Sequence, residues 1–118
     1  CGGVAAALSG TRVGLADNWL RHVKDVARRH QSLIDATAPE HRVALLCELN
    51  AIEQVVNVAQ TTVVQDAWKR GQSVTLHGWV YGLSDGLIKD LHMTVDSADD
   101  LERVYRGAVG AVGGAKRG

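Results

Sequence analysis

The sequence predicts an α/β protein in which helices dominate and one strand-turn-strand unit comes late in the chain. Apolar residues recur at helical spacing through most of the first 70 residues, and the period changes between Ser73 and Tyr81, where the sequence alternates and is rich in β-branched and aromatic residues. A two-stranded sheet is marginally stable on its own. We therefore expect the strand at 74–81 to join a larger sheet whose other strands lie upstream of Cys1.

Four helices are expected in the first 70 residues, over about 2–8, 17–30, 39–59 and 61–68. Asp17 or Asn18 can cap the second helix, and Pro39 suits the first turn of the third. The third helix is apolar on more than one side, which predicts packing on two surfaces, such as a core and a second subunit. Thr61 or Thr62 can begin the fourth helix, which is expected to end in the pattern Lys69-Arg70-Gly71.

A β-hairpin and a last helix are expected in the final third of the chain. Ser84-Asp85-Gly86 is a turn signal between a strand that ends near Tyr81 and a return strand over 87–95. Asp99 or Asp100 can cap a helix that runs through Tyr105. Five glycines fall among residues 107–118, so we expect one domain over 1–106 followed by a mobile Gly/Ala-rich tail.

The composition is that of a single soluble domain. With 118 residues the chain can form one modest core, and Lys+Arg and Asp+Glu are both 13, so the formal net charge is zero. A neutral balance argues against a nucleic-acid partner, and no apolar run approaches the length of a membrane span. Two cysteines are few, which favours a cytoplasmic location, and Cys47 in an apolar run is expected to be a buried free thiol.

Cys1 is the residue whose side chain points most clearly to a chemical function. Two glycines and a helix-forming run follow it, which places its sulfur at the start of a helix. The positive end of the helix dipole favours the thiolate, and the thiolate is the form that binds metals. A chain does not initiate at Cys and the only methionine is Met93, so we expect the sequence to be a piece of a longer protein.

Three segments, in their order along the chain, resemble the motifs of a known protein family. They are Cys1-Gly2-Gly3-Val4; Cys47-Glu48-Leu49-Asn50 with Glu53-Gln54-Val55 and Asn57; and Trp68-Lys69-Arg70-Gly71 with the run from Leu76 to Gly82 and Asp85-Gly86-Leu87. Together they resemble the β-class carbonic anhydrases, especially the bacterial type, over about residues 1–106. The resemblance implies a mostly parallel sheet flanked by helices, of which this chain is the helix-rich C-terminal portion with the last strands. It also implies homodimers that assemble further as dimers of dimers.

The same resemblance implies a zinc enzyme for the reversible hydration of CO₂ to bicarbonate and a proton by a zinc-bound hydroxide. The family holds one Zn²⁺ per subunit through two Cys, one His and, in the closed state, one Asp. Cys1 matches the second Cys, the end of the motif His-x-x-Cys-Gly-Gly, and the other three ligands would precede residue 1. None of the five histidines has the offset to replace the missing His. No complete catalytic set is therefore expected here, and the 118 residues alone are expected to be inactive.

Two further residues match functional positions of the family. Gly2 matches a residue whose backbone N–H donates to the substrate oxygens, and the alternative is a tight turn into a helix. Tyr81 matches a position that helps to hold bicarbonate at a non-catalytic site in a bacterial subset. The alternative for Tyr81 is a strand-end tyrosine that packs under a loop.

Other functions are also open at this point. The chain could be a non-catalytic fragment or an oligomerisation or interaction module of the same fold. A lipoprotein beginning at a lipidated Cys1 is disfavoured, because a helix pattern rather than a polar linker follows at once.

Structural roles are expected for the remaining polar and aromatic residues. His77 is expected to be a strand histidine with a local hydrogen bond, and His22 and His30 are expected to be solvated. Glu48 and Glu53 are expected to make structural hydrogen bonds within or between subunits. Packing anchors are expected at Trp19, Trp68 and Trp79.

Overall fold

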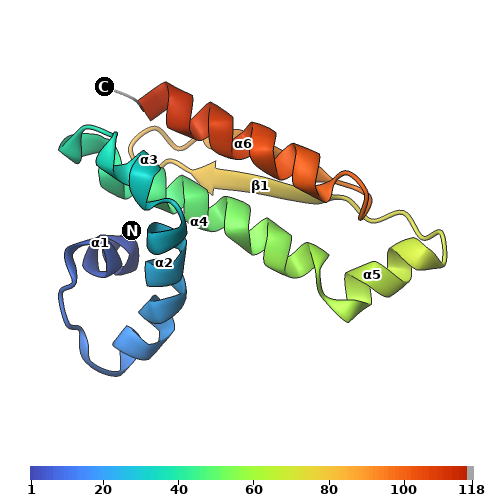
Figure 1. The fold of residues 1–118 in the computed structure, drawn as a ribbon, viewed down its shortest axis with the longest axis horizontal. Coiled ribbons are helices and arrows are strands. Elements are labelled where there is room, and N and C mark those ends of the chain that lie inside the picture. Colours follow the sequence, from blue (N-terminus) through green and yellow to red (C-terminus); the bar gives the residue numbers. More distant parts are fainter. Residues whose placement is uncertain (117–118) are drawn as a thin grey trace.

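Helix α4 (Arg42–Ala59) is the element around which the rest of the chain is arranged (Figure 1). The computed structural model describes residues 1–116. Around α4 lie α1 (Gly2–Ser9), α2 (Asp17–Arg29), α3 (Gln31–Asp35), α5 (Thr62–Lys69), β1 (Leu76–Tyr81), β2 (Ile88–Val95) and α6 (Leu101–Lys116), with 3₁₀ turns η1 (Gly14–Ala16) and η2 (Pro39–His41). Each of the helices and strands just named contacts α4.

The N-terminal helices form a small unit on one side of α4. Helix α1 ends at Gly10, which adopts the left-handed conformation at φ 76° and donates its N–H to Ala6 O at 2.9 Å. The capping role expected for Asp17 is wrong, because Ala16 is the N-cap of α2. Asp17 instead accepts the N–H of Val13 at 2.9 Å, which closes the loop that leads into α2.

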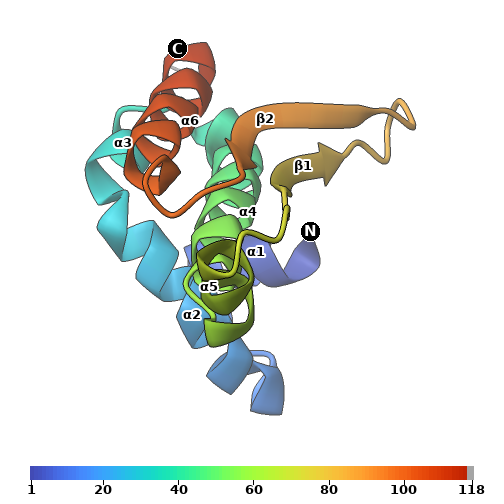
Figure 2. The same ribbon diagram turned by 90° about the vertical axis from the view of Figure 1, so that its right-hand side faces the viewer.

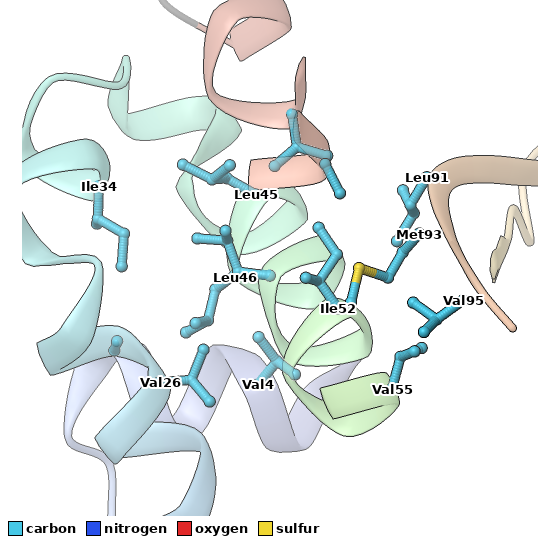
Figure 3. Packing of buried hydrophobic residues seen from close by; sticks show 14 residues of the cluster. Val4, Val26, Ile34, Leu45, Leu46, Ile52, Val55, Leu91, Met93 and Val95 are labelled. Atoms are coloured by element: carbon cyan, nitrogen blue, oxygen red, sulfur yellow. The ribbon is translucent and has the colours of Figure 1, made fainter. Parts of the chain in front are cut away.

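The core lies on both sides of α4 (Figure 3). Leu46 points toward Val4 of α1 and Val26 of α2, whereas Ile52 lies beside Met93 of β2. Five α4 residues have no exposed surface, namely Leu45, Leu46, Leu49, Ile52 and Ala59. The prediction that this helix packs on two surfaces is therefore confirmed within the chain, and its extension to a second subunit stays a prediction.

The late strand-turn-strand unit is an antiparallel hairpin that projects from the helices (Figure 2). Its inner face places Leu91, Met93 and Val95 in the core. The register shifts between Gly78 and Trp79, where Gly78 pairs with Met93. A Cβ on Gly78 would lie 2.9 Å from the Cβ of Met93, so the close approach of the two strands requires glycine there.

The hairpin turn follows the predicted chemistry. Gly86 takes φ 71°, and Asp85 Oδ1 accepts the N–H of Leu87 at 3.0 Å.

The α/β class with a dominant helical part is confirmed. The larger, mostly parallel sheet stays a prediction, because the sheet formed within residues 1–116 has the two strands β1 and β2.

The prediction of a mobile tail is wrong for residues 107–116, the part of that tail that the structure describes. Helix α6 continues to Lys116 instead of ending near Tyr105, and it buries Ala108 and Val112. Burial of these side chains outweighs the poor helix propensity of the glycines beside them. Residues 117–118 of the expected tail lie outside the described residues. A second difference is the short helix α3, which follows directly after α2 and which periodicity did not predict.

We expect Ile52→Ala to lower the free energy of unfolding by about 2–5 kcal/mol, because it opens a cavity at a side chain with 0% exposure. The measurement is urea unfolding followed by circular dichroism. Val63→Ala is the matched control: its side chain on α5 is 76% exposed, so a change within about 0.5 kcal/mol is expected. Equal losses in the two variants would contradict the core described above.

Candidate functional site

Cys1 and Gly2 lie at the first turn of α1, as the sequence predicts. Cys1 is exposed and is the N-cap residue, and its carbonyl accepts the N–H of Ala5 at 3.0 Å. No side chain caps this helix. Since the first N–H groups of an α-helix have no intrahelical acceptor, the N–H of Gly2, at the first position of α1, has no partner within the helix.

The two glycines of this turn have different surroundings. A Cβ on Gly2 would meet nothing within 4 Å, so the space beside its backbone is open. A Cβ on Gly3 would lie 3.3 Å from Leu20 Cδ2 and 3.9 Å from Cys1 Sγ. Leu20 of α2 therefore packs close to the turn that carries Cys1, and Val4 anchors the same turn in the core. The candidate ligand is held on packed helices.

The described residues do not by themselves form a zinc site. Among residues 1–116, no group of three or more His, Cys, Asp or Glu side chains is placed to hold a metal ion. The second cysteine, Cys47, is free and half-buried on α4 rather than fully buried. Structural and catalytic zinc ions in proteins need at least three protein ligands. Cys1 is therefore one candidate ligand without its companions.

Tyr81 is the last residue of β1 and belongs to the hairpin. Its side chain is 62% exposed, and its hydroxyl oxygen lies 3.6 Å from the position of a Cβ on Gly86. The hydroxyl therefore lies over the hairpin turn, which fits a strand-end tyrosine beside a loop. A bicarbonate site at Tyr81 stays a prediction.

A polar cluster around one buried carboxylate joins three helices. We call Arg29, His30, Glu53 and Tyr105 the Glu53 cluster. Glu53 has a 4% exposed side chain; its Oε2 accepts Arg29 Nη1 at 2.6 Å and its Oε1 lies 2.9 Å from His30 Nε2. The Tyr105 hydroxyl also donates to Glu53 Oε1, and it lies 3.2 Å from His30 Nε2. The cluster thus ties α2 and α6 to α4.

The contacts of this cluster change the acidity of two of its members. Burial alone would raise the pKa of Glu53, but the hydrogen bonds from Tyr105 and His30 and the charge of Arg29 outweigh it and hold that pKa below its usual range. Burial, with the hydrogen bond to Glu53 next, raises the pKa of Tyr105 to about 12. Both shifts favour ionised Glu53 beside neutral Tyr105.

The sequence identified only part of this cluster. Structural hydrogen bonds at Glu53 are confirmed, and so are those at Glu48, whose Oε1 accepts Lys89 Nζ at 2.8 Å. The prediction of a solvated His30 is wrong, because its side chain is only 10% exposed. A carboxylate on the buried face of a helix signals that partners are needed. Nothing local identifies Tyr105, 52 residues away, as one of them.

The aromatic residues divide into packed and exposed ones. Trp68 packs as predicted and donates Nε1–H to Val74 O at 2.9 Å. The packing role predicted for Trp19 is wrong, since it is 78% exposed, and Trp79 is half-exposed. Trp79 stacks on His77, with ring centroids 5.3 Å apart. The local hydrogen bond predicted for His77 is confirmed by its Nδ1, which lies 3.1 Å from Thr94 Oγ1.

Comparison with known proteins identifies the family. The family model described as carbonic anhydrase matches residues 1–88, which include Cys1 and the β1 strand. A carbonic anhydrase of Emericella nidulans is 40% identical over 107 residues, covering 89% of this chain and 47% of the relative. The chain therefore belongs to the carbonic anhydrase family, and its solved relatives are of the β class.

Two of those solved structures share the fold. The Coccomyxa β-carbonic anhydrase in complex with acetazolamide superposes with a TM-score of 0.80 at 30% identity, covering 87% of this chain and 47% of the other. A tetrameric β-carbonic anhydrase from the filamentous ascomycete Sordaria macrospora gives 0.69 at 33% identity, covering 80% and 49%. The chain spans about half the length of these relatives. None is described as bacterial, so the bacterial type stays a prediction.

No helix within residues 1–116 has both the length and the apolar character that crossing a membrane requires.

We expect Tyr105 to titrate at about pH 12 in the folded protein, because burial and the Glu53 carboxylate both disfavour the phenolate. The measurement is ultraviolet titration of phenolate absorbance in Tyr81→Phe, which leaves Tyr105 as the single tyrosine of the chain. The neutral form stabilises the fold fully below the ordinary pKa near 10, and this stabilisation is lost as the pH rises from there through about 12. Titration of Tyr105 near pH 10 would contradict the hydrogen bond to Glu53.

Proposed function

We propose that this chain serves in a zinc-dependent enzyme that hydrates CO₂ reversibly to bicarbonate and a proton, with Cys1 as one zinc ligand. The observation that carries the proposal is the family match over residues 1–88, which begins at the Cys1-Gly2-Gly3 turn. Zinc would supply hydroxide at neutral pH, a property for which carbonic anhydrases are the standard example. Three further ligands would have to come from outside residues 1–116.

The roles proposed for the first turn of α1 follow from its geometry. The exposed sulfur of Cys1 is accessible to a metal, and the N–H of Gly2 would donate to an oxygen of the substrate. Open space beside Gly2 leaves room for a small molecule, whereas Leu20 blocks the equivalent space beside Gly3. A side chain at position 2 would therefore compete with substrate for that space.

Self-association as a homodimer or a dimer of dimers is part of the proposal. The Sordaria macrospora relative is a tetramer. In this chain Leu15 is 88% exposed and Trp19, four residues later, is 78% exposed, so two large apolar side chains near the start of α2 are open to a second subunit. We also propose a cytoplasmic location, because the two cysteines are unpaired and a reducing compartment keeps thiols in that state.

A non-catalytic role is the second candidate. Residues 1–116 hold no group of three metal-binding side chains, which favours an oligomerisation or interaction module of the same fold for the chain taken alone. The two candidates differ in one respect: the enzyme needs a His three residues before Cys1 and an upstream Cys-x-Asp-x-Arg motif, whereas the module needs neither.

We expect the 118-residue chain to bind no stoichiometric zinc and to show no significant CO₂ hydration, because Cys1 alone cannot hold the ion. Zinc content is measured by elemental analysis and hydration by stopped-flow. A longer version that carries the upstream His and the Cys-x-Asp-x-Arg motif should bind one Zn²⁺ and hydrate CO₂, and Cys1→Ser should reduce both. Zinc binding by the longer version without hydration would reject the enzymatic proposal.

For Tyr81 we propose a regulatory role at a bicarbonate site. In a complete enzyme, Tyr81→Phe should weaken inhibition by bicarbonate, because it removes the hydroxyl and leaves the ring in place. The measurement is the bicarbonate dependence of the hydration rate. Unchanged inhibition would show that Tyr81 only packs beside the hairpin turn.

A further inference from the structure

The C-terminal half of α6 is a helix with little intrinsic tendency to form one. Residues 107–116 include Gly107, Gly110, Gly113 and Gly114. Glycine is the least favourable helix residue apart from proline, because it loses the most backbone freedom when it is fixed. Isolated helices of this length are marginal even with good helix formers. Tertiary contacts must therefore hold this segment in helical form.

Those contacts lie on one side of the helix, where Val109 also packs against the core. Ala108 and Val112 are buried, and a Cβ on Gly113 would lie 2.6 Å from Leu33 Cδ1. On the remaining circumference, a Cβ on Gly107, Gly110 or Gly114 would meet nothing within 4 Å. The segment thus rests on apolar contacts of small side chains.

Polar attachment to the rest of the protein comes from the first half of α6. Arg106 pairs with Glu102 and Arg103 pairs with Asp100, at or near the start of the same helix. Tyr105 instead reaches across to Glu53 of α4 and His30 at the end of α2. A hydrogen bond to an ionised, buried carboxylate is stronger than one between neutral groups.

We propose that residues 107–116 form a conditional helix: the apolar contacts of Ala108 and Val112 hold it only together with the hydrogen bond of Tyr105 to Glu53, so that the Glu53 cluster acts as a latch for this end of the chain. Helix α6 lies along α4 and the hairpin (Figure 1), and it contacts both α4 and β2. Opening of the latch uncovers the part of β2 and α4 that α6 covers, while α1 and α2 stay packed on the other side of α4. The device is independent of zinc and of the proposed catalytic function.

The test is amide hydrogen exchange, resolved by residue, on the 118-residue chain and its Tyr105→Phe variant. The variant keeps the ring and removes the hydroxyl, so exchange over 107–116 should become about 10- to 100-fold faster while the slowest amides of α4 change by about twofold or less. Glu102→Gln is the matched control on the same helix, because Glu102 pairs only locally with Arg106 in an exposed position, and it should leave 107–116 unchanged.

A rescue experiment separates the latch from general destabilisation. Gly110→Ala adds a methyl group in open space and raises helix propensity, so in the Tyr105→Phe background it should restore slow exchange over 107–116. Gly113→Ala makes the same change against Leu33 and should restore less. In the unmodified chain, the amides of 107–116 should already exchange faster than those of α4. This comparison does not require the Tyr105→Phe variant to fold. Exchange of 107–116 at the α4 rate in the unmodified chain would overturn the proposal.

Discussion

Burial of α4 is the constraint on which the rest of this structure depends. The helix is apolar around much of its circumference, so no single neighbour can cover it. Helices α1 and α2 cover one side through Val4 and Val26, and the hairpin and α6 cover another through Met93 and Val112. Because removing this apolar surface from water is the main favourable term in folding, the positions of both flanking units follow from α4.

Glu53 determines how the helices packed on α4 are oriented. Apolar contacts tolerate some sliding of one helix over another, but a buried carboxylate must be met by donors at fixed places. Those donors come from α2 and α6, so the Glu53 cluster fixes how both helices are rotated and positioned on α4. The same contacts that satisfy the charge also explain the altered acidity of Glu53 and Tyr105.

The packing around α4 also supports Cys1, the candidate zinc ligand, although residues 1–116 do not supply the other ligands that a zinc ion needs. Cys1 begins a helix that Val4 anchors in the core and that Leu20 of α2 packs against. Its sulfur and the N–H of Gly2 are therefore presented from a packed scaffold, which is what a metal or substrate site requires of its supporting residues. The chain covers about half of each of the two solved relatives.

The sequence by itself determined the elements whose signals are local. The helices over 17–30 and 39–59, the Thr61 cap, the Asp85-Gly86 turn and the motifs that mark the family all depend on residues that are close in the chain. Tertiary structure alone decided that 107–116 is helical, that the His30 side chain is only 10% exposed and that Trp19 is exposed. The physical reason is that these outcomes rest on contacts between residues far apart in sequence, such as Tyr105 with Glu53, and local propensity even opposes the first of them.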